Sequence, residues 1–286
     1  MTADEQLRYE SRVRTRQTVI AGAAGLLVIA ATALQLAGPH TKVDELTLDL
    51  ITAHKRYPLD LIGAILNACG FILIGLTLVF LLRITRARTP QTGGWVRILA
   101  IIGAGLAAIS GVAYAAVIAS KASDFVSHGN QTYEQAHQLT HGAGLVVLPL
   151  LGQFAALLLA VSVVMTALNA MRAGLLTKFM GYLGIFAGVL VIFPIGASAT
   201  IVQGFWLLAL ALLISGRWPG GSPPAWSTGQ AERWPTGAEM REQRMRAGGG
   251  RPGRMKPAPA PAPEPVGAPA PRTRATTSKR KRKKRH

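Results

Sequence analysis

Glu134, His137 and His141 have the residue types and the spacing of a metal site. On a helix, positions i, i+3 and i+7 share one face, so the three side chains point in a similar direction. Two histidines four residues apart form a spacing that zinc sites use, and a neighbouring carboxylate can serve as a third ligand. These three residues are therefore our candidate ligands for a divalent metal ion.

The same residues have a second interpretation, that of a solvated helix end. They precede the apolar block 143–168 and stand beside Gln135 and Gln138, as expected where a polar helix meets a membrane surface. No Glu follows His137 directly, so the HExxH pattern of zinc proteases is absent. The sequence also lacks a Walker-type loop and a dinucleotide-binding fingerprint. We predict no catalytic residue and favour a non-enzymatic protein.

Six apolar segments surround this polar stretch. A helix of about 20 apolar residues crosses a hydrocarbon core of about 30 Å. The segments that approach this length are 18–37, 59–82, 98–119, 143–168, 179–195 and 198–215. Only helices satisfy their own backbone polar groups in lipid at such lengths, so we predict an all-α fold, a polytopic transmembrane helical bundle over 18–216. The last two segments are short, and the alternative is a re-entrant hairpin over 179–215 with four or five full spans.

Basic residues alternate between the two sides of the predicted bundle. Ten Lys and Arg lie in the N-terminal segment 1–17 and in loops 83–97 and 169–178, against four in loops 38–58 and 120–142. Basic loops favour the cytoplasmic side, which predicts cytoplasmic termini for a multi-pass protein of the cell (inner) membrane. The candidate metal ligands then lie outside the cytoplasm.

The C-terminal quarter carries most of the formal net charge of +18. Residues 217–286 hold 17 Lys and Arg but only four Asp and Glu. We predict that 247–286, rich in Pro and Ala, is disordered, because it has too little apolar content to fold. Its last basic residues are expected to contact anionic lipid headgroups: Lys279, Arg280, Lys281, Arg282, Lys283, Lys284 and Arg285. Nucleic acid is the alternative partner, disfavoured because 246–286 has no aromatic residue for base stacking.

Two further segments are predicted to lie at membrane surfaces. Residues 217–246 carry tryptophans at intervals of eight, and Trp prefers the membrane interface, so this Trp/Pro segment is expected along the inner leaflet. In the first outer loop, Val43, Leu46, Leu50 and His54 have helical spacing, which predicts a short amphipathic surface helix.

Small and polar residues within the spans predict how the helices pack. Gly184 and Gly188 form a GxxxG pattern, and the pairs Ala21/Gly25 and Gly111/Ala115 have the same spacing, which we interpret as intramolecular packing. Carriers usually place a charged residue or a histidine inside the bundle, but no such residue lies in the middle of a predicted span here. The deep polar residues, interpreted as interhelical hydrogen-bonding groups, are Gln35, Asn67, Ser110, Tyr114, Gln153, Ser162 and Gln203.

The six-span layout with the segment Arg-Trp-Pro-Gly-Gly-Ser-Pro-Pro-Ala-Trp at 217–226 resembles uncharacterised multi-pass membrane proteins of high-GC actinobacteria. The resemblance covers most of 18–235 and implies no activity. We predict a structural or interaction role with a polybasic cytoplasmic tail. The alternative is a metal-binding or small-solute-handling protein that uses the outer His and Glu residues, and a transporter is the third hypothesis.

Overall fold

The predicted all-α class is confirmed. The computed structural model describes residues 3–37, 46–128, 130–192, 197–219, 221–232, 239, 241–242 and 245–246, with nine helices named among them. The chain divides into two units, 1–234 and 235–286, and the nine helices belong to the first. The tail 247–286, with its predicted lipid contacts at Lys279 to Arg285, lies outside the described residues.

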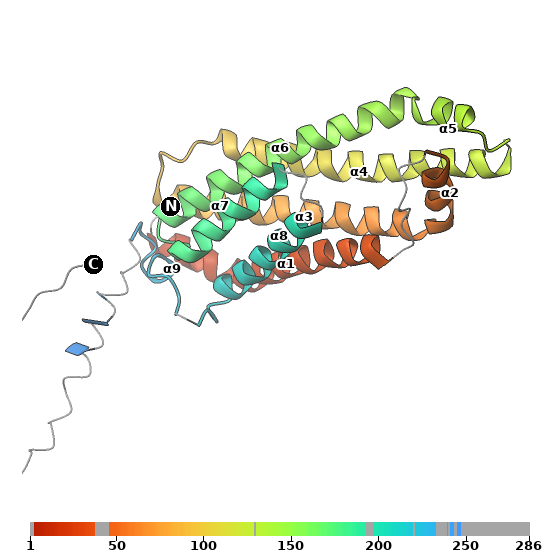
Figure 1. The fold of residues 1–286 in the computed structure, drawn as a ribbon. Coiled ribbons are helices and arrows are strands. Elements are labelled where there is room, and N and C mark those ends of the chain that lie inside the picture. The colour runs from red at the N-terminus through yellow and green to blue at the C-terminus, as the bar shows by residue number, and fades with distance from the viewer. Residues whose placement is uncertain are drawn as a thin grey trace, which may run out of the picture. The chain divides into compact units, whose positions relative to one another are not determined.

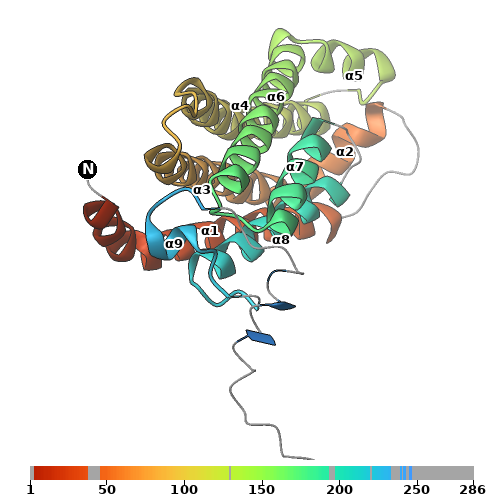
Figure 2. The same cartoon turned by 90° about the vertical axis from the view of Figure 1, so that its left-hand side faces the viewer.

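Four long apolar helices form the frame of the first unit (Figure 1). They are α1 (Ala3–Ala37), α3 (Leu59–Arg88), α4 (Trp95–Ser127) and α6 (Ala143–Arg172). Each is long and apolar enough to cross a membrane. Neighbours in this frame pack side by side in the order α1, α3, α4, α6, as both views show (Figures 1 and 2).

The last two predicted spans form shorter helices, α7 (Lys178–Ile192) and α8 (Ala197–Ile214). At 1.5 Å per residue, the 15 residues of α7 extend about 22 Å, less than a hydrocarbon core of about 30 Å. α7 packs on α6 and α8 packs on α1, and both end part way along the longer helices (Figure 1). Length therefore supports four of the six predicted spans, and the short pair fits the alternative of a re-entrant hairpin.

Glycines allow the short helices to approach the long ones closely. A Cβ on Gly25 of α1 would lie 2.8 Å from the carbonyl oxygen of Gly204 on α8. A Cβ on Gly188 of α7 would lie 2.8 Å from a methyl group of Val164 on α6. The prediction of intramolecular packing is confirmed at these positions. Gly111 differs, because a Cβ there would meet no atom within 4 Å.

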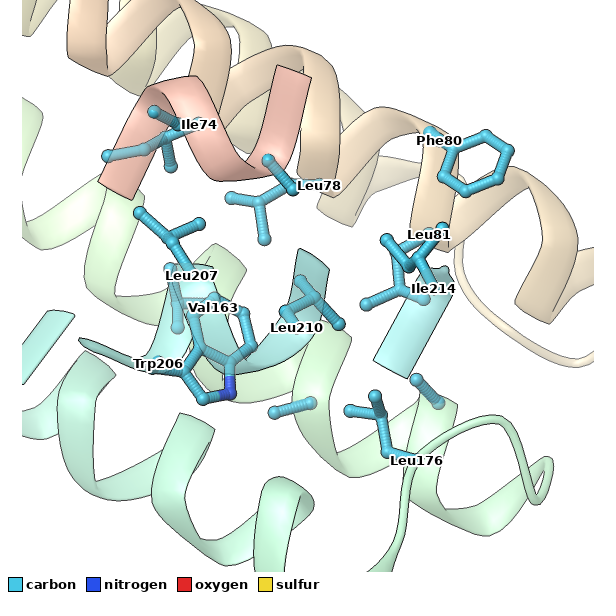
Figure 3. Close-up of a cluster of buried hydrophobic side chains, with 14 of the residues drawn as sticks. Ile74, Leu78, Phe80, Leu81, Val163, Leu176, Trp206, Leu207, Leu210 and Ile214 are labelled. Carbon is cyan, nitrogen blue, oxygen red and sulfur yellow. The ribbon is translucent and has the colours of Figure 1, made fainter. Parts of the chain in front are cut away.

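The apolar core lies where α8 meets the long helices (Figure 3). Trp206 is fully buried, and its indole nitrogen donates a hydrogen bond of 3.1 Å to the carbonyl oxygen of Met180. The labelled side chains around it come from α3, α6, α8 and the connection before α7: Ile74, Leu78, Phe80, Leu81, Val163, Leu176, Leu207, Leu210 and Ile214. This core packs α7 and α8 against the four long helices.

One end of the first unit is covered by α2 (Leu46–Arg56) and α5 (Tyr133–Thr140). The predicted surface helix in the first outer loop is present from Leu46, whereas residues 38–45 lie outside the described part of the chain. Its Leu50 is buried with Phe125 and Ala136 and therefore faces protein. α2 and α5 thus form a cap over this end of the bundle.

A buried ion pair closes the other end. The guanidinium of Arg88 binds both carboxylate oxygens of Glu10, at 2.6 and 2.8 Å, and also donates to the carbonyl oxygen of Ala225 in α9 (Ala225–Thr228). Trp226 is buried beside it and donates a 3.0 Å hydrogen bond to the carbonyl oxygen of Leu175. Trp226 therefore packs inside the protein. The predicted membrane-surface position of the whole 217–246 segment stays a prediction.

Candidate functional site

A cavity of about 530 Å³ lies beneath the cap, between α1, α2, α3 and α4. Its size suits a small organic molecule. Its polar lining consists of Gln35, Asp49, Thr52, Arg56, Asp60, Asn67 and Tyr114. The rest of the wall is apolar, so the cavity has the mixed lining of a ligand pocket.

Arg56 and Asp60 form the polar rim of this cavity. The Nε of Arg56 donates to both carboxylate oxygens of Asp60, at 2.9 and 3.0 Å. Its Nη2 also donates a 2.9 Å hydrogen bond to the carbonyl oxygen of Gln35, near the end of α1. Charge-assisted forked contacts of this kind hold geometry well. The pair therefore fixes the ends of α1 and α2 to the start of α3.

Asn67 lies deeper in the cavity, on the same face of α3 as Asp60, since the two positions are seven residues apart. Its Oδ1 is buried and has no hydrogen-bond partner in the described structure. A buried amide oxygen without a partner is unfavourable, by about 1–3 kcal/mol in proteins. A ligand that donates a hydrogen bond to Oδ1 would remove this penalty.

The cavity continues inward to an apolar floor. A second cavity of about 200 Å³ shares Phe71, Ala107 and Gly111 with the first and extends to Gly152 of α6 and Val191 of α7. This explains why Gly111 faces open space. A bound molecule would meet charges at the rim and apolar side chains at the floor, so the combined site fits an amphipathic ligand.

Four of the seven deep polar residues predicted as interhelical groups line these two cavities: Gln35, Asn67, Ser110 and Tyr114. Ser162 instead donates a 2.7 Å hydrogen bond to Leu158 within its own helix, and Gln153 is exposed on α6. The Nε2 of Gln203 is buried without a hydrogen-bond partner in the described structure. Most of the deep polar groups therefore surround one site.

The lining offers acceptors to a ligand that carries hydrogen-bond donors. The carboxylates of Asp49 and Asp60 both have partners, Asp60 in its pair with Arg56, so neither is free. The Oδ1 of Asn67 is a buried acceptor that lacks a partner in the described structure. An amine combines N–H donors for Asn67 with an apolar chain for the floor.

The predicted metal ligands lie on the cap, apart from this cavity. Glu134 and His137 belong to α5, His141 is the residue that ends it, and all three are exposed. The two imidazole rings stack with centroids 3.7 Å apart, and Nδ1 of His141 lies 2.9 Å from the carbonyl oxygen of His137. Among the described residues, no group of three His, Cys, Asp or Glu side chains is placed to hold a metal ion, and metal binding here stays a prediction.

The rim residues were missed at the level of sequence, where Arg56 served only as a loop charge. A signal was present, because Arg56 and Asp60 have the i, i+4 spacing of a helical ion pair. Pro58 between them argues against one continuous helix, which hid the pair. The predicted resemblance to actinobacterial membrane proteins stays a prediction. Comparison of the chain with protein-family models, with curated proteins and with solved structures gave no match.

Proposed function

We propose that this protein spans the cell (inner) membrane with α1, α3, α4 and α6, and that α7 and α8 enter from the cytoplasmic side as a re-entrant hairpin. The end with the N-terminus and α9 holds the basic residues that flank the long helices, such as Arg83, Arg97 and Arg172 (Figure 1). The positive-inside tendency supports a cytoplasmic location for that end. A re-entrant hairpin leaves the membrane on the side from which it entered, so four spans still leave both termini on one side.

We further propose that the protein is non-enzymatic and holds a receptor or carrier site for a small amphipathic amine. The observation that carries this proposal is the buried, unpartnered Oδ1 of Asn67 in a cavity with the Arg56–Asp60 pair at its rim and an apolar floor. Small-solute handling was an alternative to a structural role, assigned to the histidines of α5. The cavity supports that alternative with different residues, and net movement of the ligand across the membrane remains the third hypothesis.

Three probes with the same apolar chain test the preference for N–H donors: hexylammonium, hexanoate and hexanol. We expect hexylammonium to raise the thermal unfolding temperature of the full-length protein in detergent most, because only it supplies N–H donors for the Oδ1 of Asn67. Equal shifts from the three probes would show apolar partitioning and would refute a site for an amine.

Two variants localise the effect. Asn67→Leu removes the amide in the cavity, whereas Gln153→Leu removes a polar group of similar depth that is exposed on α6. The stabilisation by hexylammonium should be lost in Asn67→Leu and retained in Gln153→Leu. An Asn67→Leu protein that responds like the wild type would place the binding elsewhere.

The basic tail has a separate proposed role. Its seven consecutive basic residues support contact with anionic headgroups, since each basic residue near such a surface contributes about 1 kcal/mol. Deletion of 247–286 should weaken co-sedimentation of the detergent-solubilised protein with anionic vesicles and change the partners recovered by pull-down. Unchanged localisation and unchanged partners would reject an adhesive tail.

A further inference from the structure

A third cavity, of about 710 Å³, lies at the end of the first unit opposite to the cap. The last turns of α3, the start of α4 and the residues that follow α9 form its wall. Four of the lining residues are arginines, Arg83, Arg86, Arg88 and Arg97, and the described lining contains no acidic residue. The charged side chains of this lining are thus all basic, whereas those of the cavity beneath the cap include Asp49 and Asp60.

Within the described part of the chain, only one of these arginines is neutralised by a carboxylate. Arg88 is paired with Glu10, whereas Arg83 lies over the ring of Tyr9 at 4.4 Å from its centroid. Arg86 and Arg97 have no ion-pair partner among the described residues. Three guanidinium groups without carboxylates therefore face one space, and their mutual repulsion favours a bound anion. Guanidinium groups suit phosphate in particular, because their forked N–H groups match its oxygens.

The start of α4 adds donors to the same cavity. Gly94 precedes the helix without a side-chain hydrogen bond to its first turn, and Gly93 and Gly94 both line the cavity. The free N–H groups and the positive dipole end of a helix favour a phosphate. This contribution supplements the arginines, which carry the argument.

The cavity borders the apolar surface of the bundle. Trp95 directly follows Gly94 and Ile98 lies one turn further along α4, and both side chains are exposed, as are Ile101 and Ile102 in the next turn. Exposed Trp next to exposed Ile marks the boundary between headgroups and acyl chains. A phosphate in the cavity would therefore have apolar helix surface beside it.

We propose that this cavity binds a phosphate group, supplied by the headgroup of an anionic phospholipid whose chains lie against α4, or by a soluble phosphate compound. Arg86 and Arg97 are the primary contacts, and Arg83 supports them from the preceding turn of α3. Three probes added to the full-length protein in detergent separate the sources: short-chain phosphatidylglycerol, phosphatidylcholine with the same chains, and inorganic pyrophosphate.

The first test compares two charge-matched double variants. Arg86→Gln with Arg97→Gln removes two charges from the cavity, and Arg172→Gln with Arg217→Gln removes two exposed charges outside its lining. We expect the first to weaken binding of phosphatidylglycerol or pyrophosphate by about tenfold or more, which is about 1.4 kcal/mol or more, and the second to change it little. Equal losses would indicate general electrostatic attraction and would overturn the proposal.

A third variant guards against loss of folding. A Cβ on Gly94 would lie 3.2 Å from Nη1 of Arg86, so Gly94→Asp places a carboxylate where the phosphate is expected and also caps α4. This variant should keep or raise the thermal stability yet lose the anion. Preference for phosphatidylglycerol over pyrophosphate identifies a lipid, and the reverse identifies a soluble phosphate. Absence of saturable binding by either probe, or unchanged binding in Gly94→Asp, refutes the site.

Discussion

Glu10 and Arg88 meet in the protein interior, with exposed side-chain fractions of 3% and 0%. Their contact joins α1 to α3, and the bond from Arg88 to Ala225 adds α9. Sequence reasoning used Arg88 only as a basic loop residue, because charge counts carry no information on distant partners. The pair lies 78 positions apart in the chain, so no local pattern could reveal it.

Glu10→Gln tests the contribution of this pair to stability. The substitution leaves Arg88 buried without a countercharge, and loss of one partner of a buried pair costs about 3–5 kcal/mol. We expect a clearly lower thermal unfolding temperature for the protein in detergent. Glu242→Gln is the control, because its partner Arg246 and Glu242 itself are 80% and 62% exposed, and exposed pairs contribute little. Similar unfolding temperatures for the two variants would contradict the importance of the buried pair.

The candidate site shows the same difference between local and distant information. The spacing of Glu134, His137 and His141 is local, and the structure does place them at one helix end. Gln35, Arg56, Asn67 and Tyr114 come from different helices and meet only through tertiary packing. Hydropathy identifies Gln35, Asn67 and Tyr114 as deep and polar, but it does not say which helix faces which.

At the scale of helices, apolar length was the most informative signal. It predicted the cores of the four long helices, although α3 and α4 continue beyond the predicted spans to Arg88 and Ser127. The apolar pattern stops where the membrane is expected to stop, whereas the backbone hydrogen bonds continue into the polar ends. For α7 and α8, the same signal left six spans and a re-entrant hairpin open, and their observed lengths favour the hairpin.

The contact between α1 and α8 depends on glycine at its closest point. Gly25→Ala would bring its Cβ to 2.8 Å from a backbone oxygen of Gly204, which cannot move as a side chain can. Overpacking of this kind costs about 1–3 kcal/mol, so the thermal unfolding temperature should fall. In Gly105→Ala, on α4, the new methyl group meets no atom within 4 Å, and the better helix propensity of Ala should stabilise the protein by about 0.5–1 kcal/mol. If both variants unfold at the same temperature, the close approach of α1 and α8 at Gly25 does not limit the stability of the protein.

At the scale of the whole molecule, the proposed orientation across the membrane can be measured by cysteine labelling. Ser127 ends α4 and Gln91 lies in the connection that precedes α4; both are exposed, and Cys69 is first replaced by Ser. An impermeant maleimide should label Ser127→Cys in intact cells and should label Gln91→Cys only after lysis. Labelling with the opposite preference would show the opposite orientation, with the cavity beneath the cap on the cytoplasmic side.

The shortness of α7 and α8 has a consequence for the surrounding lipid. Near α9 the first unit contains these two helices as well as the four long ones, whereas closer to the cap only the four long helices continue (Figure 1). In the proposed membrane arrangement, the protein displaces more lipid area from the leaflet around α9 than from the opposite leaflet. A protein that is wider in one leaflet fits best where the membrane is convex on the side of that leaflet. Membrane curvature can therefore influence where the protein accumulates.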